Sequence, residues 1–243
     1  MNDRVLTGRL ALALVAGVLT TVLAIALGNW QSRRGDAKEA IQAQWDAAER
    51  GAPIQLSNPD DAGAVSVALP RRVTVRGEFI PAATVFVDNR TLDGVAGFQV
   101  VTPLRLDSGT AVLVSRGWLA RDARDPLRIP ELTAPVGSVV IDGLAVARVP
   151  RLLELASVTL PALPGIWPNL EFEEYERVSR LKVPRFVIQQ TSDTADGLRR
   201  VWVRPATGVE KHRGYALQWY GLAALTAGLT LYFGGRALRR SNQ

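Results

Sequence analysis

The sequence predicts an α+β membrane protein in which two transmembrane helices, one at each end, flank a single antiparallel β-sheet or barrel-like domain. Three observations predict this class. One uncharged run extends from Leu10 to Ser32 and a second from Gly214 to Gly235, and the region between them alternates apolar and polar residues. About 20 apolar residues cross a bilayer core, whereas a period of two is typical of half-buried strands.

The N-terminal part is expected to form a membrane span followed by a linker. Trp30 closes the first apolar run, as aromatic residues do at a membrane interface. The run preceded by Arg4 and Arg9 also fits a cleaved signal peptide, but its length and the poor cleavage site at Gly28–Gln31 argue against cleavage. The predicted segments are a cytoplasmic N-terminus at 1–9, a transmembrane helix at 10–30, and an amphipathic helix with a linker at 31–70.

A β-rich periplasmic domain is predicted at residues 71–211. Val73, Val75 and Phe79 alternate with polar residues, and short turn-forming connectors favour antiparallel neighbours because parallel pairs need long crossovers. Residues 152–183 mix a prolyl segment with an acidic helical stretch at 171–176, and their role stays open. Strands are predicted at residues 72–79, 84–88, 98–106, 111–118, 138–149, 185–190 and 198–204.

The C-terminal part is expected to hold the second transmembrane helix at 212–235 and a basic cytoplasmic tail at 236–243. Tyr215, Trp219 and Tyr220 open this span as an interfacial aromatic belt would. Both spans carry small residues four positions apart, a spacing that lets helix backbones approach closely. We therefore expect the two spans to pack on each other. These residues are Ala13 and Gly17, Ala16, Thr20 and Ala24, and Ala224 and Gly228.

Charge placement predicts the topology. The chain has a net charge of +6, of which the head carries +1 and the tail +3, so residues 10–235 carry only +2. Positive ends favour the cytoplasmic side of the membrane, although Arg33, Arg34 and Lys38 oppose this assignment. We expect a multi-pass protein of a bacterial inner (plasma) membrane with both termini in the cytoplasm. The near-neutral middle argues against nucleic acid as a partner, and the absence of cysteine excludes disulfides and thiolate sites.

His212 is the only histidine, and it lies beside the second apolar run. It is therefore the single imidazole that could act as a base or bind a metal. Positions 212, 215 or 216, 219 and 223 share one helix face, so we expect His212, Tyr215, Trp219 and Ala223 together. The alternative is an interfacial histidine that only hydrogen-bonds headgroups or protein. No serine elbow, zinc-protease motif or phosphate-binding loop is present, so we expect no enzyme.

Five motifs stand out in a fixed order, and the likeness that they carry extends over most of the chain, from about Gly28 to Tyr232. They are Gly28-Asn29-Trp30-Gln31 with Arg33 and Lys38; Val87-Asp88-Asn89-Arg90; Gly94 with Gly97–Leu104; Val114-Ser115-Arg116-Gly117-Trp118; and His212 with Tyr215–Trp219. In this order and with two spans, the chain resembles the Surfeit locus protein 1 family, assembly factors of haem-copper cytochrome c oxidase. Lys211 and Ser115 stand where that family commonly has asparagine, and residues 152–183 match it poorly.

The resemblance implies a transient complex with haem a, accepted from haem a synthase and passed to cytochrome c oxidase subunit I. The matching His212 is the implied axial ligand of the haem iron, with Tyr215 and Trp219 beside it. Lys211 and Arg213 would meet the two propionates, because charge-assisted contacts are strong. The alternative is a protein-interaction chaperone that stabilises nascent subunit I without haem. A membrane-tethered hydrolase is a third possibility.

The other motifs are expected to serve partner binding or structure. Arg90 and Arg116 could present a guanidinium to a carboxylate, either a propionate or a partner's side chain, or they could act as scaffold. Asp88, Asn89 and Gly117 suit turn geometry at strand ends. Trp118, Trp30 and Gln31 complete the set of partner or structural residues, and the bilayer is itself an expected partner.

Overall fold

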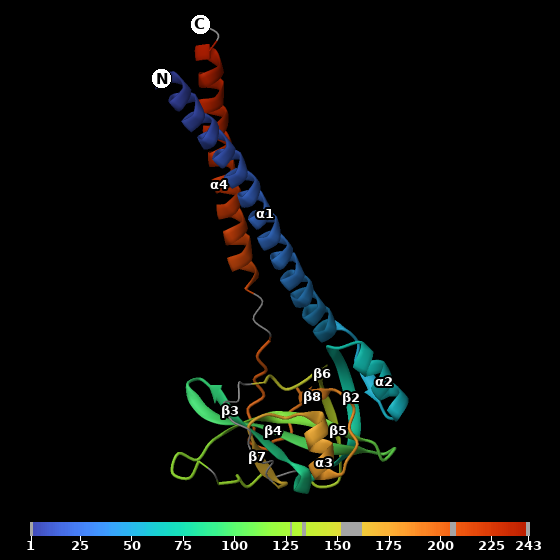
Figure 1. Ribbon diagram of the computed structural model, residues 1–243. Helices are drawn as coiled ribbons and strands as arrows, with labels where there is room; N and C mark the ends of the chain where they lie inside the picture. Colours follow the sequence, from blue (N-terminus) through green and yellow to red (C-terminus); the bar gives the residue numbers. More distant parts are fainter. Residues whose placement is uncertain (1, 127, 133–134, 152–161, 205–207, 242–243) are drawn as a thin grey trace. The chain divides into compact units, whose positions relative to one another are not determined.

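The computed structural model describes residues 2–126, 128–132, 135–151, 162–204 and 208–241 (Figure 1). The chain divides into two compact units. The helical unit comprises Met1–Ala43 and Pro205–Gln243, and the β unit comprises Gln44–Arg204.

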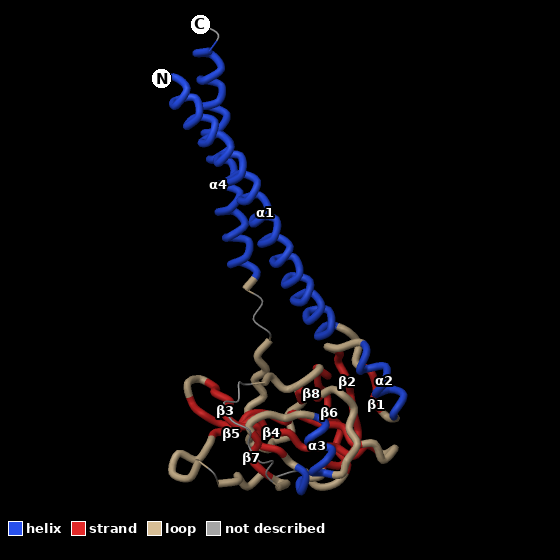
Figure 2. Tube along the Cα trace, in the orientation of Figure 1, coloured by secondary structure: helices blue, strands red, loops and turns tan. Residues whose placement is uncertain are grey.

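The helical unit contains two long helices, α1 (Asn2–Arg50) and α4 (Val209–Ser241). The last turns of α1, from Gln44 to Arg50, belong to the β unit. The two helices run side by side (Figure 2). Neither helix contains proline, so nothing interrupts the backbone ladder. The expected boundary at residue 30 therefore lies inside one continuous helix that ends at Arg50.

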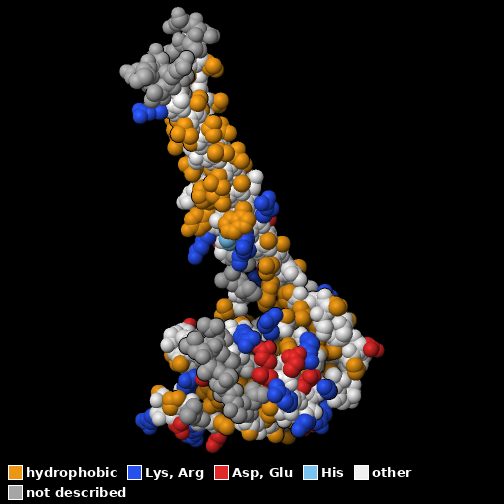
Figure 3. Space-filling model, in the orientation of Figure 1, with side chains coloured by type: hydrophobic (Ala, Val, Ile, Leu, Met, Phe, Trp, Pro, Cys, Tyr) orange, Lys and Arg blue, Asp and Glu red, His pale blue; other side chains and the backbone are white. Residues whose placement is uncertain are grey.

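The surface of the helical unit is largely apolar, and leucine, valine and isoleucine side chains are exposed along both helices (Figure 3). Among the described residues, one helix, Gly8–Arg50, is long and apolar enough to cross a bilayer. Gln218, two neighbouring aromatic residues and several glycines lower the hydropathy of α4. The predicted membrane helix at the N-terminus is thus supported, while the second span remains a prediction.

One mixed sheet forms the β unit and closes on itself. β4 pairs with β5 along one edge, whereas its other edge pairs first with β3 and then, beyond residue 103, with β2. In the closed ring the order is β2 (Arg71–Phe79), β6 (Ser138–Val146), β8 (Val187–Gln190), β5 (Ala111–Ala120), β4 (Val95–Leu106) and β2 again. Outside the ring, β1 (Ile54–Leu56) joins β2, while β3 (Val85–Leu92) and β7 (Gly165–Trp167) extend from β4; η1 (Pro81–Ala83) precedes β3.

The barrel-like closure is confirmed, but the purely antiparallel arrangement is wrong. β1 pairs with β2, β3 with β7, and β5 with β8 in parallel. Short connectors constrain only strands that are consecutive in the chain, and each of these pairs is joined by a longer segment. The strand expected at 198–204 is also wrong, because only Arg199 forms an isolated bridge, with Trp118.

The region at 31–70, expected to hold an amphipathic helix and a linker, also contains β1 and a helix, α2 (Pro59–Val67). Asn58 caps this helix: its side chain accepts a hydrogen bond from the Asp61 backbone, and the Asp61 carboxylate accepts one from Asn58 N. Such a capping box with proline at the first helical position is a recognised start signal. The prediction missed it because Pro, Asp and Ser also mark loops.

Apolar side chains of the ring strands fill the barrel interior, including Val73, Val75, Leu104 and Ile188. Gly77 is required where β2 meets β4, because a Cβ there would lie 2.2 Å from Arg105 O. The predicted acidic helix is α3 (Phe172–Ser179). Its buried Tyr175 packs in a second cluster and donates a hydrogen bond of 3.0 Å to Ala83 O. Burial raises the pKa of the Tyr175 phenol, despite a hydrogen bond from Ser179 that lowers it.

Candidate functional site

His212 lies in the first turn of α4, and its ring is held by α1. Its Nδ1 is 2.8 Å from Oε1 of Gln31. An amide oxygen can only accept a hydrogen bond, so this contact places the ring proton on Nδ1. Nε2 makes no hydrogen bond within the described part of the chain. The imidazole is partly exposed, so it combines a fixed orientation with an accessible basic nitrogen.

Arg213 faces acidic residues of α1. Its Nη2 lies 2.9 Å from Asp36 Oδ1 and 2.8 Å from Glu39 Oε2. Gly35 is buried opposite this turn, where an added Cβ would lie 3.6 Å from Arg213 Cδ and 3.7 Å from His212 Cβ. Arg213 is therefore committed to two carboxylates within the helical unit, whereas Lys211 is exposed.

Tyr220, two turns farther along α4, makes a second polar link to α1. Its hydroxyl donates to Asn29 Oδ1 at 2.7 Å and lies 3.3 Å from Ser32 Oγ. Its ring lies against Gly28, where a Cβ would approach Cε1 to 2.6 Å. Trp30 is exposed, and Arg34 lies over its ring at 5.2 Å. The Gly28–Gln31 motif thus supplies contacts to α4 from three of its four residues.

Small residues separate the two helices along the rest of their contact. Thr21 and Thr226 share a hydrogen bond of 2.8 Å, and a Cβ on Gly17 would collide with Thr230. The residues of least exposure recur at steps of three and four, the spacing of a coiled-coil seam. The two helices pack on each other as predicted, but only Gly17 and Ala24 of the predicted small residues lie in the seam. The others are exposed, namely Ala13, Ala16, Thr20, Ala224 and Gly228. The seam residues are Gly17, Thr21, Ala24, Gly28, Gln31 and Gly35 on α1, and His212, Ala216, Trp219, Ala223, Thr226 and Thr230 on α4.

The helix face that carries His212 differs from the predicted one at a single position, where Ala216 takes the place of Tyr215. Ala216 is 4% exposed and lies in the seam, whereas Tyr215 is 54% exposed and points away from it. Trp219 is half-buried and Ala223 is buried. A rotation of about 100° per residue separates neighbouring positions, so 212, 216, 219 and 223 share the face and 215 lies at its side.

A single imidazole limits the chemistry of this site. The described residues contain no group of three or more His, Cys, Asp or Glu side chains able to hold a metal ion. A single imidazole suits a metal that brings most of its own ligands, as the iron of a macrocycle does.

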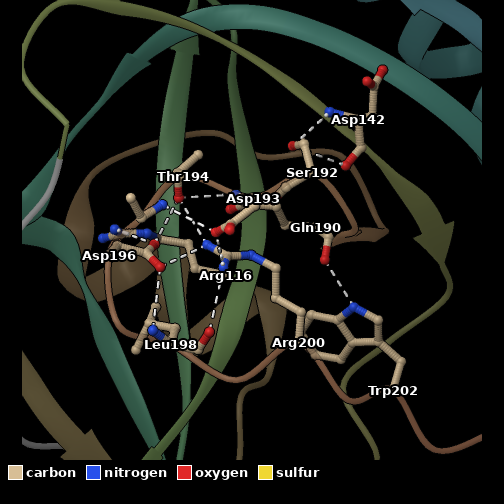
Figure 4. A network of polar contacts seen from close by, with 11 residues as sticks. Arg116, Asp142, Gln190, Ser192, Asp193, Thr194, Asp196, Leu198, Arg200 and Trp202 are labelled. Atoms are coloured by element: carbon tan, nitrogen blue, oxygen red, sulfur yellow. Dashed lines mark hydrogen bonds and ion pairs between the residues drawn. The ribbon is translucent and has the colours of Figure 1, made fainter.

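Arg116, a candidate for carboxylate binding, is instead committed to the interior of the β unit (Figure 4). Its guanidinium lies 2.8 Å from Asp196 Oδ2, with the two side chains 0% and 1% exposed, and 4.8 Å from the centre of the Phe79 ring. Arg200 reaches the other oxygen of Asp196 at 2.7 Å. This arrangement favours scaffolding for Arg116.

The electrostatics of this pair follow from burial and hydrogen bonding. Burial lowers the pKa of Arg116, although Asp196 opposes that effect. Burial alone would raise the pKa of Asp196, but hydrogen bonds from Arg200, Thr194, Arg116 and the Leu198 N–H outweigh it. The net effect is an Asp196 pKa below its usual range, so the carboxylate stays ionised.

The other strand-end motif is also built into the β unit. Asn89 adopts a positive φ of 57° at an irregularity of β3, and Asp88 pairs with Arg121. Trp118 Nε1 donates to Arg90 O at 2.7 Å. Burial lowers the pKa of Arg90, and among the described residues its buried Nε and Nη2 have no hydrogen-bond partner. Gly117 has a φ of 154°, and a Cβ there would meet Leu198 Cβ at 2.8 Å.

Asp196 and Arg200 were not identified from the sequence, because Asp196-Gly197 has the pattern of a turn. The available signal was the spacing of the two residues: Asp196 lies in a turn after a strand, and Arg200 follows it four residues later. The Gln31–His212 contact joins residues 181 positions apart, so no local pattern could predict it.

Comparison with known proteins gives consistent matches. The sequence profile of the SURF1 family matches residues 18–224. A SURF1-like protein of Rickettsia felis is 25% identical over 85% of this chain and 89% of its own length. Surfeit locus protein 1 of Mus musculus is 27% identical over 86% of this chain and 72% of its own length. A SURF1-like protein of Dictyostelium discoideum is 36% identical, over 45% of this chain and 43% of its own length.

Proposed function

The chain belongs to the SURF1 family, and on that premise we propose that it is a non-enzymatic assembly factor for haem-copper cytochrome c oxidase. Its cargo in this proposal is haem a, received from haem a synthase and delivered to subunit I. The proposed setting is a bacterial inner membrane crossed by α1 and α4, with both termini in the cytoplasm and the β unit in the periplasm. Positive charges at both chain ends support this orientation.

The observation that carries the proposal is the contact between Gln31 and His212. With Nδ1 bonded to Gln31 Oε1 at 2.8 Å, Nε2 is the nitrogen available to coordinate iron. A hydrogen bond to the second ring nitrogen fixes the tautomer and raises the basicity of the ligating one. His212 is thus chemically suited to be an axial ligand.

The surroundings of His212 fit a haem in part. Tyr215 and neighbouring apolar residues of α4 are exposed and offer an apolar contact surface. Lys211 is exposed and suits a propionate. Arg213 suits one less well, because Asp36 and Glu39 already occupy its guanidinium. We therefore expect Lys211, and not Arg213, to bind a propionate.

Production of the chain together with its haem a synthase, followed by purification in detergent, tests the proposal. A preparation that carries haem a and loses it in His212→Ala supports haem transfer. Gln218→Ala, at an exposed position of α4 outside the seam, is the matched control and should retain haem. A colourless preparation that still captures subunit I would favour the interaction chaperone and overturn the haem role.

A further inference from the structure

A cleft of about 420 Å³ opens on the outer face of the barrel, within the β unit. Its floor is a row of three side chains that strand pairing places side by side. Arg72 of β2 is opposite Leu144 of β6, which is opposite Gln189 of β8. Val73 and Val75 of β2 are buried in the barrel interior, so Arg72 points to the opposite face of the sheet.

Two tryptophans form the walls. Trp45, near the C-terminal end of α1, packs against a cluster of Ala48, Leu144 and Val146. Trp202 stands in the segment that follows the buried network, and its Nε1 donates to Gln190 O at 2.8 Å (Figure 4). Both indoles are therefore fixed before any ligand arrives, which lowers the entropic cost of binding.

The charges of the cleft leave one cation without a counterion. Arg204 lies 2.6 Å from Asp46 and also pairs with Glu49, so its single positive charge is already met by two carboxylates. Arg72 makes no ion pair or hydrogen bond through its side chain within the residues that the structure describes. A guanidinium that has no counterion among the described residues and lines the same cleft as two indoles suits an anion that carries an apolar body.

We propose that this cleft binds a small amphipathic carboxylate, with the carboxylate on Arg72 and a flat apolar body against Trp45 and Trp202. The volume of the cleft lies within the range of about 300–1,000 Å³ typical of small-molecule sites, which combine apolar walls with a few polar groups. Gln189 and Thr191 also line the cleft and can donate further hydrogen bonds to the carboxylate. This site is separate from His212 and does not depend on the haem proposal.

Calorimetric titration of the full chain in a nonionic detergent tests the inference with two probes, 2-naphthaleneacetate and its neutral amide. The two probes share the flat body and differ in charge. The carboxylate is expected to bind at least about tenfold more tightly, the effect of one charge-assisted contact. Arg72→Gln should abolish this preference. Arg76→Gln, on the same strand and face but outside the cleft lining, should preserve it.

A second variant keeps the test independent of Arg72. Thr191→Glu adds a carboxylate to the lining at an exposed position and should also remove the preference for the anionic probe. The inference is overturned if neither probe binds, if both bind equally, or if the preference survives in Arg72→Gln or Thr191→Glu.

Discussion

Removal of the Asp196 carboxylate is expected to destabilise the β unit severely. In the Asp196→Ala variant, Arg116 would remain in the interior with a side chain that is 0% exposed. Arg200, which is 12% exposed, would lose its contact of 2.7 Å. Removal of one partner from a buried ion pair costs about 3–5 kcal/mol. The contact with Phe79 is too weak to offset that cost.

The loss of stability in Asp196→Ala can be compared with that in a variant of Asp193, an exposed neighbour. Asp193 also pairs with Arg200, at 3.2 Å, but its side chain is 86% exposed. An exposed ion pair contributes about 0–1 kcal/mol. Asp193→Ala is therefore the matched control: it removes a carboxylate from the same arginine and should leave stability almost unchanged.

Thermal unfolding of the full chain in detergent, followed by tryptophan fluorescence, measures both variants. For a unit of this size, about 1 kcal/mol shifts the Tm by roughly 2–4 °C, so Asp196→Ala should lower the Tm by about 6–20 °C. Equal Tm values for Asp196→Ala and Asp193→Ala would refute the reasoning, because burial would then carry no penalty.

Three further predictions concern acid stability and the two helices. The stabilisation due to Asp196 should be constant above about pH 5 and should shrink as the pH falls below about 4, because its folded-state pKa lies below the unfolded value near 3.9. A gap between the wild type and Asp196→Ala that is as large at about pH 3 as at about pH 6 in chemical denaturation would contradict this. Gln31→Leu removes the hydrogen bond to His212 and should weaken haem a binding by about 10–100-fold in a spectroscopic titration, whereas Gln42→Leu, exposed on the same helix, should bind normally. Gly28→Leu should push α1 away from α4 at Tyr220, whereas Gly221→Leu, with open space around it, should not. Spin labels at Arg33→Cys and Leu217→Cys measure the distance between the helices, and no native cysteine interferes because the chain has none. An unchanged distance in Gly28→Leu would contradict the packing.

The sequence predicted those elements whose signal is local. The period of two in Val73, Val75 and Phe79 corresponds to β2, and the uncharged runs correspond to α1 and α4. The segment at 198–204 has a similar alternation, yet Val201 and Val203 are exposed. The segment is held by the bridge of Arg199 to Trp118, by the ion pair of Arg200 with Asp196 and by the hydrogen bond of Trp202. Alternation alone does not decide whether a strand finds a partner.

Long-range pairing could not be predicted from the sequence. The closure of β2 on β4 needs a glycine at 77, but a single glycine in a strand has several explanations. The candidate site was similar: His212 and Gln31 were both identified as motif residues, while their contact became visible only once α1 and α4 were placed side by side. The role of Arg116 depended on Asp196, 80 positions away.

Titration of haem a against the purified chain and its His212→Ala variant, followed by the Soret band, tests the central proposal most directly. The account predicts a saturable spectral shift for the wild-type chain and a weaker, shifted spectrum for the variant. Identical affinity and identical spectra in the two proteins would contradict it.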